Sequence, residues 1–295
     1  MPRKGNHQLA TARPHLPNPG GAQPGRRYFL ASLALLALGQ PPRRGCADDA
    51  LSPWCVAFSP DSRTLAAGTA AGPICLWGVA TGELRSELTG HRDAVFGVHF
   101  SPDGTWLASC GRDMPGVRVW DIAGKRVLHG IAAHPQWTWC ARFSPDGKRL
   151  ATCGDDAVVR LWNSATGLPA AELRGHRGTV KRIAWTTDSR RLLSAGDDGL
   201  LHVWDPDAGA ELHALKGHGG WIESVAAGPG ALAVTAGGDQ TLRKWDTAAG
   251  KLLATFHVTA RDFSALAISP DGKLAATGSA DGTLHHWNVE TDALL

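Results

Sequence analysis

The chain has 295 residues, of which 43% are hydrophobic and 19% charged, so it can bury a substantial core and is not a disordered polymer. Its formal net charge of +3 originates in residues 1–50, which carry seven of the 30 Lys and Arg residues but only two of the 27 Asp and Glu residues. The other 23 basic and 25 acidic residues give residues 51–295 a net charge of −2. This balance excludes a broad phosphate-binding surface, and we expect no nucleic-acid partner.

Residues 1–50 are predicted to form a disordered leader that contains a signal peptide. Arg26 and Arg27 precede an apolar run over residues 28–38, which has the length of a signal-peptide core and is too short to span a bilayer. The arrangement resembles a twin-arginine export signal, which implies a periplasmic or other extracytoplasmic protein. A disordered cytoplasmic tail is the alternative. No other long apolar segment follows, so we expect no membrane span in the mature chain.

The cysteines show none of the spacings that bind zinc, form a thioredoxin-like pair or attach haem. The six are Cys46, Cys55, Cys75, Cys110, Cys140 and Cys153. We expect buried, unreactive thiols, and neither a cofactor nor a metal ion. A metal site at His99 or at the adjacent pair His285 and His286 is disfavoured, because neighbouring strand residues point to opposite faces.

An internal repeat of about 42 residues runs through residues 51–295. Its most visible markers are Trp77, Trp120, Trp162, Trp204, Trp245 and Trp287, spaced by 43, 42, 42, 41 and 42 residues. A period of this size is typical of a four-stranded propeller blade.

Each repeat predicts four antiparallel strands. The Trp closes an alternating segment such as residues 158–162, and such a two-residue rhythm indicates a strand. An earlier strand ends in a turn such as Ser144-Pro145-Asp146-Gly147, in which proline, Asp and Gly each favour the turn. A second turn, such as residues 165–167, leads to an outer strand. One such sheet cannot bury both faces alone, so we expect the sheets to stack radially around an axis.

These features resemble the WD40-repeat family. Gly-His opens the units at residues 90–91, 175–176 and 217–218, and Trp-Asp closes them at residues 120–121, 204–205 and 245–246. The resemblance implies an all-β fold, a WD40 β-propeller of about six four-stranded antiparallel blades over residues 51–295. The chain stops where the sixth outer strand should begin, so the last blade is expected to lack most of that strand. A truncated gene or a missing seventh blade stays open.

The resemblance also implies a buried hydrogen-bonded tetrad of His, Ser or Thr, Asp and Trp in each blade. The complete sets are His91, Ser109, Asp113, Trp120; His134, Thr152, Asp156, Trp162; His176, Ser194, Asp198, Trp204; and His218, Thr235, Asp239, Trp245. The sixth unit has Thr259 in place of His, and the first has Ala67 and Ala71 in place of Ser/Thr and Asp. Fourfold repetition together with Trp favours a structural role over a hydrolase triad.

The family binds partners at positions near the start of each inner strand and just before the tetrad Asp. Carried over, these positions give Trp54, Phe96, Arg112, Trp137, Trp139, Asp155, Lys181, Asp197, Trp221, Glu223 and Asp262 as candidate partner-binding residues. The density of Trp and Phe predicts an aromatic rim for a partner, because Trp and Arg dominate interface hot spots. The alternative is that Trp54, Phe96 and Trp139 pack between blades.

These observations favour a non-catalytic scaffold that binds one or more proteins. A propeller enzyme is disfavoured, because no constellation assigns an acid, a base and a nucleophile. A propeller that senses a ligand such as a carbohydrate on its tryptophans is the stronger alternative.

Overall fold

The computed structural model describes residues 53–258, 263–279 and 281–295, which form six four-stranded antiparallel sheets. The first three blades are β1 (Pro53–Phe58), β2 (Thr64–Thr69), β3 (Ile74–Gly78), β4 (Leu84–Leu88); β5 (Val95–Phe100), β6 (Trp106–Gly111), β7 (Val117–Asp121), β8 (Arg126–Ile131); and β9 (Thr138–Phe143), β10 (Arg149–Gly154), β11 (Val158–Asn163), β12 (Pro169–Arg174). The last three are β13 (Val180–Trp185), β14 (Leu192–Gly196), β15 (Leu201–Asp205), β16 (Ala210–Leu215); β17 (Ile222–Ala227), β18 (Leu232–Gly237), β19 (Thr241–Asp246), β20 (Lys251–His257); and β21 (Phe263–Ile268), β22 (Leu274–Ser279), β23 (Leu284–Asn288), β24 (Ala293–Leu294).

The Ser-Pro-Asp-Gly turns join the first and second strands of a blade, as expected. In blade 3, the Ser144 hydroxyl donates to the Asp146 carboxylate at 2.5 Å, and Asp146 accepts the backbone N–H of Lys148 at 3.1 Å. Gly147 has a φ of 73°, a conformation that glycine adopts without strain. The local sequence therefore sets where the strand reverses.

The core consists of apolar layers between consecutive blades. Ile74 and Leu88 of blade 1 lie in one cluster with Trp120 of blade 2, and Leu173 of blade 3 lies in another with Trp204 of blade 4. Each of these tryptophans packs in the layer that its own blade shares with the preceding blade. Stacking therefore buries sheet faces that a single blade would leave in water.

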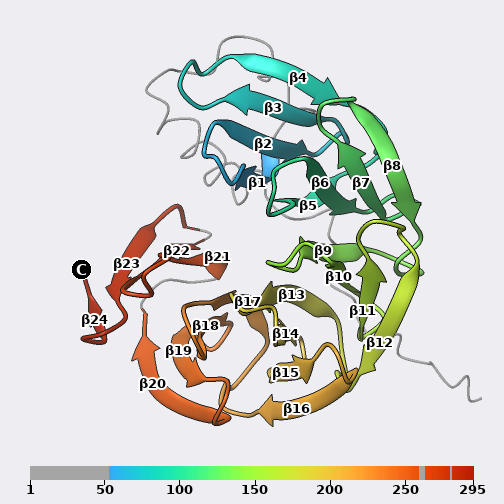
Figure 1. The fold of residues 1–295 in the computed structure, drawn as a ribbon. Coiled ribbons are helices and arrows are strands. Elements are labelled where there is room, and N and C mark those ends of the chain that lie inside the picture. Colours follow the sequence, from blue (N-terminus) through green and yellow to red (C-terminus); the bar gives the residue numbers. More distant parts are fainter. Residues whose placement is uncertain (1–52, 259–262, 280) are drawn as a thin grey trace, which may run out of the picture.

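The inner strands β1, β5, β9, β13, β17 and β21 surround one centre, as Figure 1 shows. Neighbouring inner strands pack together in chain order from β1 to β21, and β21 makes no comparably extensive contact with β1 among the described residues. All six inner strands begin at one end of the central axis and finish at the other.

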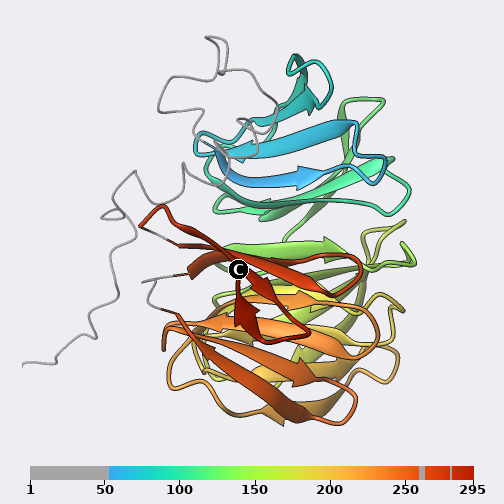
Figure 2. The same ribbon diagram turned by 90° about the vertical axis from the view of Figure 1, so that its left-hand side faces the viewer.

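The last blade is incomplete at its outer edge, which confirms the sequence expectation. Its fourth strand, β24, has two residues and pairs only with Trp287 and Asn288 of β23. Figure 2 views the ring from the side that carries β24 and the C-terminus. In the described ranges, no helix is long and apolar enough to cross a membrane.

Candidate functional site

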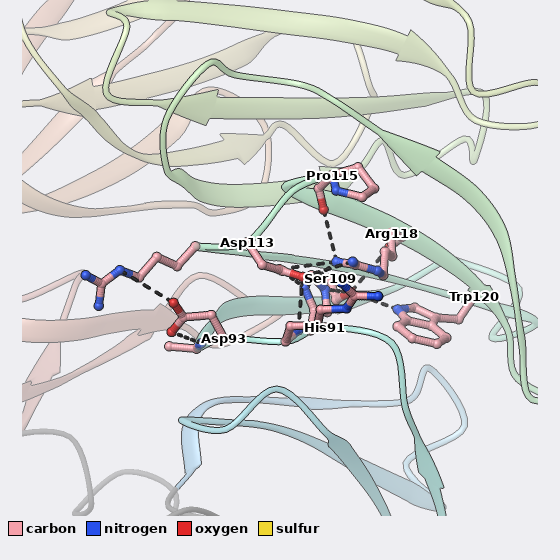
Figure 3. Close-up of polar contacts among 10 residues, drawn as sticks. His91, Asp93, Ser109, Asp113, Pro115, Arg118 and Trp120 are labelled. Atoms are coloured by element: carbon pink, nitrogen blue, oxygen red, sulfur yellow. Dashed lines mark hydrogen bonds and ion pairs between the residues drawn. The ribbon is translucent and has the colours of Figure 1, made fainter.

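The tetrad of blade 2 forms one directed chain of hydrogen bonds (Figure 3). The Trp120 indole donates to Ser109 Oγ at 2.8 Å, Ser109 Oγ lies 2.7 Å from His91 Nε2, and His91 Nδ1 lies 2.6 Å from Asp113 Oδ1. A carboxylate only accepts, so Nδ1 carries the proton and Nε2 accepts the serine hydroxyl. The order of donation is therefore Trp, Ser, His and Asp.

The same chain recurs in blades 3, 4 and 5. The distances from His Nδ1 to the Asp oxygen are 2.7 Å for His134–Asp156, 2.7 Å for His176–Asp198 and 2.9 Å for His218–Asp239. Thr152, Ser194 and Thr235 bridge these histidines to Trp162, Trp204 and Trp245. Among the described residues of blade 6, the tetrad is reduced to the contact between Trp287 and Thr277, at 3.5 Å. The structure thus brings together every member of the four sets that the repeat pattern assembles.

The Asp-His-Ser order matches that of a hydrolase triad, but the serine has no access to a substrate. Ser109 and Ser194 are 0% exposed, and each hydroxyl oxygen accepts an indole N–H. A nucleophile must approach the carbonyl that it attacks, and these oxygens are enclosed by their own blades. The tetrads therefore hold the blades together rather than carry out chemistry.

Charge stabilises the tetrads as well. Burial would raise the pKa of Asp113, but hydrogen bonds from His91 and Arg118 outweigh it and hold that pKa well below its usual range. Burial lowers the pKa of His91, which keeps the imidazole neutral at pH 7. The tetrad is thus an ionised carboxylate with a neutral histidine.

Blade 4 differs from its neighbours in the cation beside the tetrad. Arg118 and Arg160 form ion pairs with the tetrad carboxylates of their blades, at 2.9 Å and 2.5 Å. Blade 4 has His202 instead, 1% exposed, with Nε2 3.5 Å from Asp198 and Nδ1 3.5 Å from Glu211. Neither ring nitrogen makes a hydrogen bond within the described residues.

His176, Asp198 and His202 place their ligand atoms within 4.8 Å of one another, the one trio of metal-ligating side chains within the described ranges. His176 and Asp198 already satisfy each other in the tetrad at 2.7 Å. A metal would displace the proton that holds this blade together, so we assign the trio to the blade rather than to a metal centre.

The aromatic candidates of blades 1, 2 and 3 form one stacked cluster. Phe96 lies between Trp54 and Trp139, with centroid distances of 5.4 Å and 4.7 Å. Trp137 meets Phe96 edge-on at 6.1 Å, and the Arg112 guanidinium lies 4.9 Å from the centre of the Trp137 ring. These residues come from the starts of neighbouring inner strands and from one loop, so three blades build a single surface, which we call the aromatic cluster.

Hydrogen bonds and charges fix the edge of the aromatic cluster. The Trp139 indole donates to Asp155 at 2.6 Å, and exposed Arg112 lies 3.7 Å from the Asp93 carboxylate. Asp93 was not among the sequence candidates. It lies two residues after His91, whereas the partner-contact positions carried over from the family lie three and five residues after that histidine.

The candidates of blades 4 and 5 form a second, polar group. Lys181 contacts Asp197 at 3.1 Å and Glu223 at 3.0 Å, and its ammonium lies 5.5 Å from the ring centre of Trp221. Trp221 is 45% exposed, whereas the four rings of the aromatic cluster are half-buried or buried.

Phe96 and Asp262 differ from the other candidate residues. Phe96 is only 8% exposed, so it supports the aromatic cluster from below and offers little surface of its own, as the packing alternative anticipates. Asp262 lies outside the described residues. Trp54, Trp137 and Trp139 are half-buried.

Comparison with known proteins identifies the repeat. The family described as "WD domain, G-beta repeat" matches six segments, namely residues 46–77, 82–114, 125–163, 167–205, 209–246 and 250–288. Each of the last five segments begins with the outer strand of one blade and continues into the inner strands of the next, and the six together cover well over half of the chain. A comparison with curated proteins finds no match. The chain therefore belongs to the WD-repeat family and is a six-bladed WD40 propeller.

Proposed function

We propose that the protein is a non-catalytic scaffold that binds a protein partner at the aromatic end of the ring. The observation that carries the proposal is the aromatic cluster, in which Phe96 holds Trp54 and Trp139 in stacked positions. Rings that are fixed before binding lose little conformational freedom when a partner covers them. Such preorganised aromatic side chains are typical of interface hot spots.

Charged groups around the rings support a protein partner. Arg112 and Asp93 border Trp137 on one side, while Lys181 and Glu223 lie beside Trp221 on the other. An apolar centre with a rim of both charge signs is the usual anatomy of a protein interface. WD40 propellers are commonly interaction scaffolds, and the enclosed Ser109 and Ser194 hydroxyls give no support to an enzyme.

The test is an affinity capture with variants of this surface. The double variant Trp137→Ala, Trp221→Ala removes two rings, and Leu168→Ala, Leu253→Ala is the control, because both leucines are exposed on outer segments. The proposal predicts a specific protein retained by the wild type and the control but lost from the tryptophan variant, with all three folded by circular dichroism. Equal retention by the tryptophan variant refutes the proposal.

A carbohydrate-sensing propeller is the second candidate, favoured by the exposed ring of Trp221, since sugars stack on tryptophan faces. Titration of a panel of oligosaccharides, followed by calorimetry, separates the two functions. Saturable sugar binding that disappears in Trp221→Ala favours the sensor.

We further propose that the protein is exported. The support is the sequence alone, in which Arg26 and Arg27 precede an apolar run over residues 28–38. Replacement of both arginines by lysine should retain the precursor in the cytoplasm, as measured by fractionation and by the mass of the N-terminal peptide. Unchanged fractionation contradicts export by this signal.

A further inference from the structure

A cavity of about 470 Å³ occupies the end of the ring opposite the aromatic cluster. Its wall is built by the last residues of all six inner strands and, in blades 1, 2 and 3, by the prolines of the turns that follow. Phe58, Phe100, Phe143 and Trp185 give it an aromatic lining. The volume falls within the range of small-molecule sites, about 300–1,000 Å³.

Among the described residues that line the cavity, Arg142 alone carries a formal charge. The residues in the same repeat position of the other blades are Ala57, His99, Ala184, Ala226 and Ala267, all of which line the cavity. No lining residue is an Asp or a Glu. The four alanines thus leave open space in the cavity, and Arg142 is the residue that contributes a guanidinium to its wall.

Within the described part of the chain, the Arg142 guanidinium has no protein counter-charge. Its Nε is buried without a hydrogen bond, and no ion pair or side-chain hydrogen bond joins Arg142 to any other described residue. The backbone nearby is fixed, since the Trp185 indole donates to the Arg142 carbonyl at 3.1 Å. A half-buried cation in an apolar surrounding is costly unless an anion or water satisfies it.

His99 adds a neutral donor to the same wall. Its Nδ1 accepts the backbone N–H of Phe143 at 3.2 Å, so the ring proton lies on Nε2. No hydrogen bond between described residues involves Nε2. Arg142 and His99 lie in neighbouring blades, on β9 and β5, and together they offer donors but no acceptor to a ligand.

We propose that this cavity binds a small organic carboxylate, with the carboxylate on Arg142 and the apolar body against the aromatic wall. A guanidinium matches a carboxylate through two parallel hydrogen bonds, whereas the aromatic lining favours a ligand with an apolar body over a bare anion. The site lies at the opposite end of the axis from the aromatic cluster and does not depend on the proposed scaffold function.

The test uses phenylacetate and octanoate as probes, with phenylacetamide and inorganic phosphate as controls, in calorimetric and ligand-observed NMR titrations of the full chain. Saturable binding of either carboxylate below about 20 mM, with no binding of the amide, supports the proposal. Absence of saturation by both carboxylates, equal binding of the amide, or stronger binding of phosphate overturns it.

Variants show whether carboxylate binding depends on Arg142. Arg142→Met should weaken carboxylate binding by at least about tenfold, because it removes both charge and bidentate geometry. Arg190→Gln is the matched control, an exposed arginine in a turn at the same end of the ring. Binding that survives Arg142→Met, or that is lost in Arg190→Gln, contradicts the assignment.

A second variant keeps the test decisive if Arg142→Met does not fold. Ala184→Glu places a carboxylate in the cavity wall of the blade next to Arg142. This built-in anion should raise the melting temperature and abolish binding of both probes. Undiminished probe binding by a folded Ala184→Glu variant would refute the site.

Discussion

The ring of Phe96 lies nearly parallel to that of Trp139, with 13° between the planes and 4.7 Å between the centroids, although the two residues belong to different blades. Trp54, from a third blade, covers the other face of Phe96 at 5.4 Å. The contact therefore joins three blades at the end of the ring that we propose as the binding surface. It also makes the surface and the fold partly interdependent.

Phe96 and Trp221 should respond in opposite ways to truncation. Phe96→Ala leaves a cavity between two indoles and should lower the free energy of unfolding by about 3–5 kcal/mol. Trp221→Ala removes an exposed ring and its contact with Lys181, so its cost should stay within about 1 kcal/mol. Urea unfolding of both variants measures the difference. A larger loss for Trp221→Ala than for Phe96→Ala would show that the cluster is not the structural support described here.

His202→Arg should stabilise blade 4. The substitution provides the permanently charged group that Arg118 and Arg160 provide in blades 2 and 3, and it can reach both Asp198 and Glu211. We expect a gain of about 1 kcal/mol in the free energy of unfolding, since charge-assisted hydrogen bonds replace two contacts of 3.5 Å. The reciprocal change, Arg160→His, should reduce stability. Destabilisation by His202→Arg would show that blade 4 is shaped for the imidazole.

Acid should destabilise the folded ring, and protonation of the buried histidines should be the first cause as the pH falls. Burial lowers the pKa of His91, His134, His176 and His218 from 6.5, so the unfolded chain binds protons at these sites before the folded chain does. The free energy of unfolding then decreases as pH falls below 6.5. The tetrad aspartates extend the decrease to lower pH, because their folded pKa values are also lowered. Melting curves from neutral pH down to about pH 4 measure this trend.

His99 should contribute to the same decrease in stability at low pH. Burial, assisted by the charge of Arg142, lowers the pKa of His99 from 6.5 to about 3. Its contribution to stability is complete above pH 6.5 and is lost as pH falls towards 3. His99→Gln should therefore make the decrease shallower by up to about 1.4 kcal/mol per pH unit. A melting temperature that rises on acidification would contradict both expectations.

The repeat made the fold predictable, because each blade has the same types of residue at the same positions of the period. The positions of Trp120, Trp162, Trp204 and Trp245 within one period fix the third strand of each blade and the indole that closes each tetrad. The partners of those indoles followed from matching offsets, and the hydrogen bonds at Ser109 and Ser194 have the predicted members. The period of the sequence therefore predicts the contacts within one blade.

Contacts between blades were harder to predict, since sequence offsets do not give distances across the ring. Trp54, Phe96, Trp137 and Trp139 were candidates individually, but their mutual stacking depends on how closely the blades approach at that end. The cavity was missed for the same reason. A signal for it existed nevertheless, since Arg142 occupies a repeat position at which four other blades have alanine.

His202 was missed although the repeat marks it. Arg118, Arg160 and Arg243 stand two residues before the tetrad tryptophans of their blades, and His202 stands at that position in blade 4. The histidine at this position stands out only if the arginine is recognised as part of the repeat. The ion pairs of the three arginines with Asp113, Asp156 and Asp239 show that the arginine belongs to the tetrad of each blade.

Photo-cross-linking from position 221 shows whether a protein partner covers the aromatic end of the ring. A photoreactive phenylalanine analogue in place of Trp221 lies on the exposed ring position beside Lys181, and the same analogue at Leu253 serves as the control on the outer strand β20. We expect a cross-link from position 221 to the protein that the wild type captures, and none from position 253. Cross-links from position 253 alone, or equally from both, would contradict a binding surface at the aromatic end.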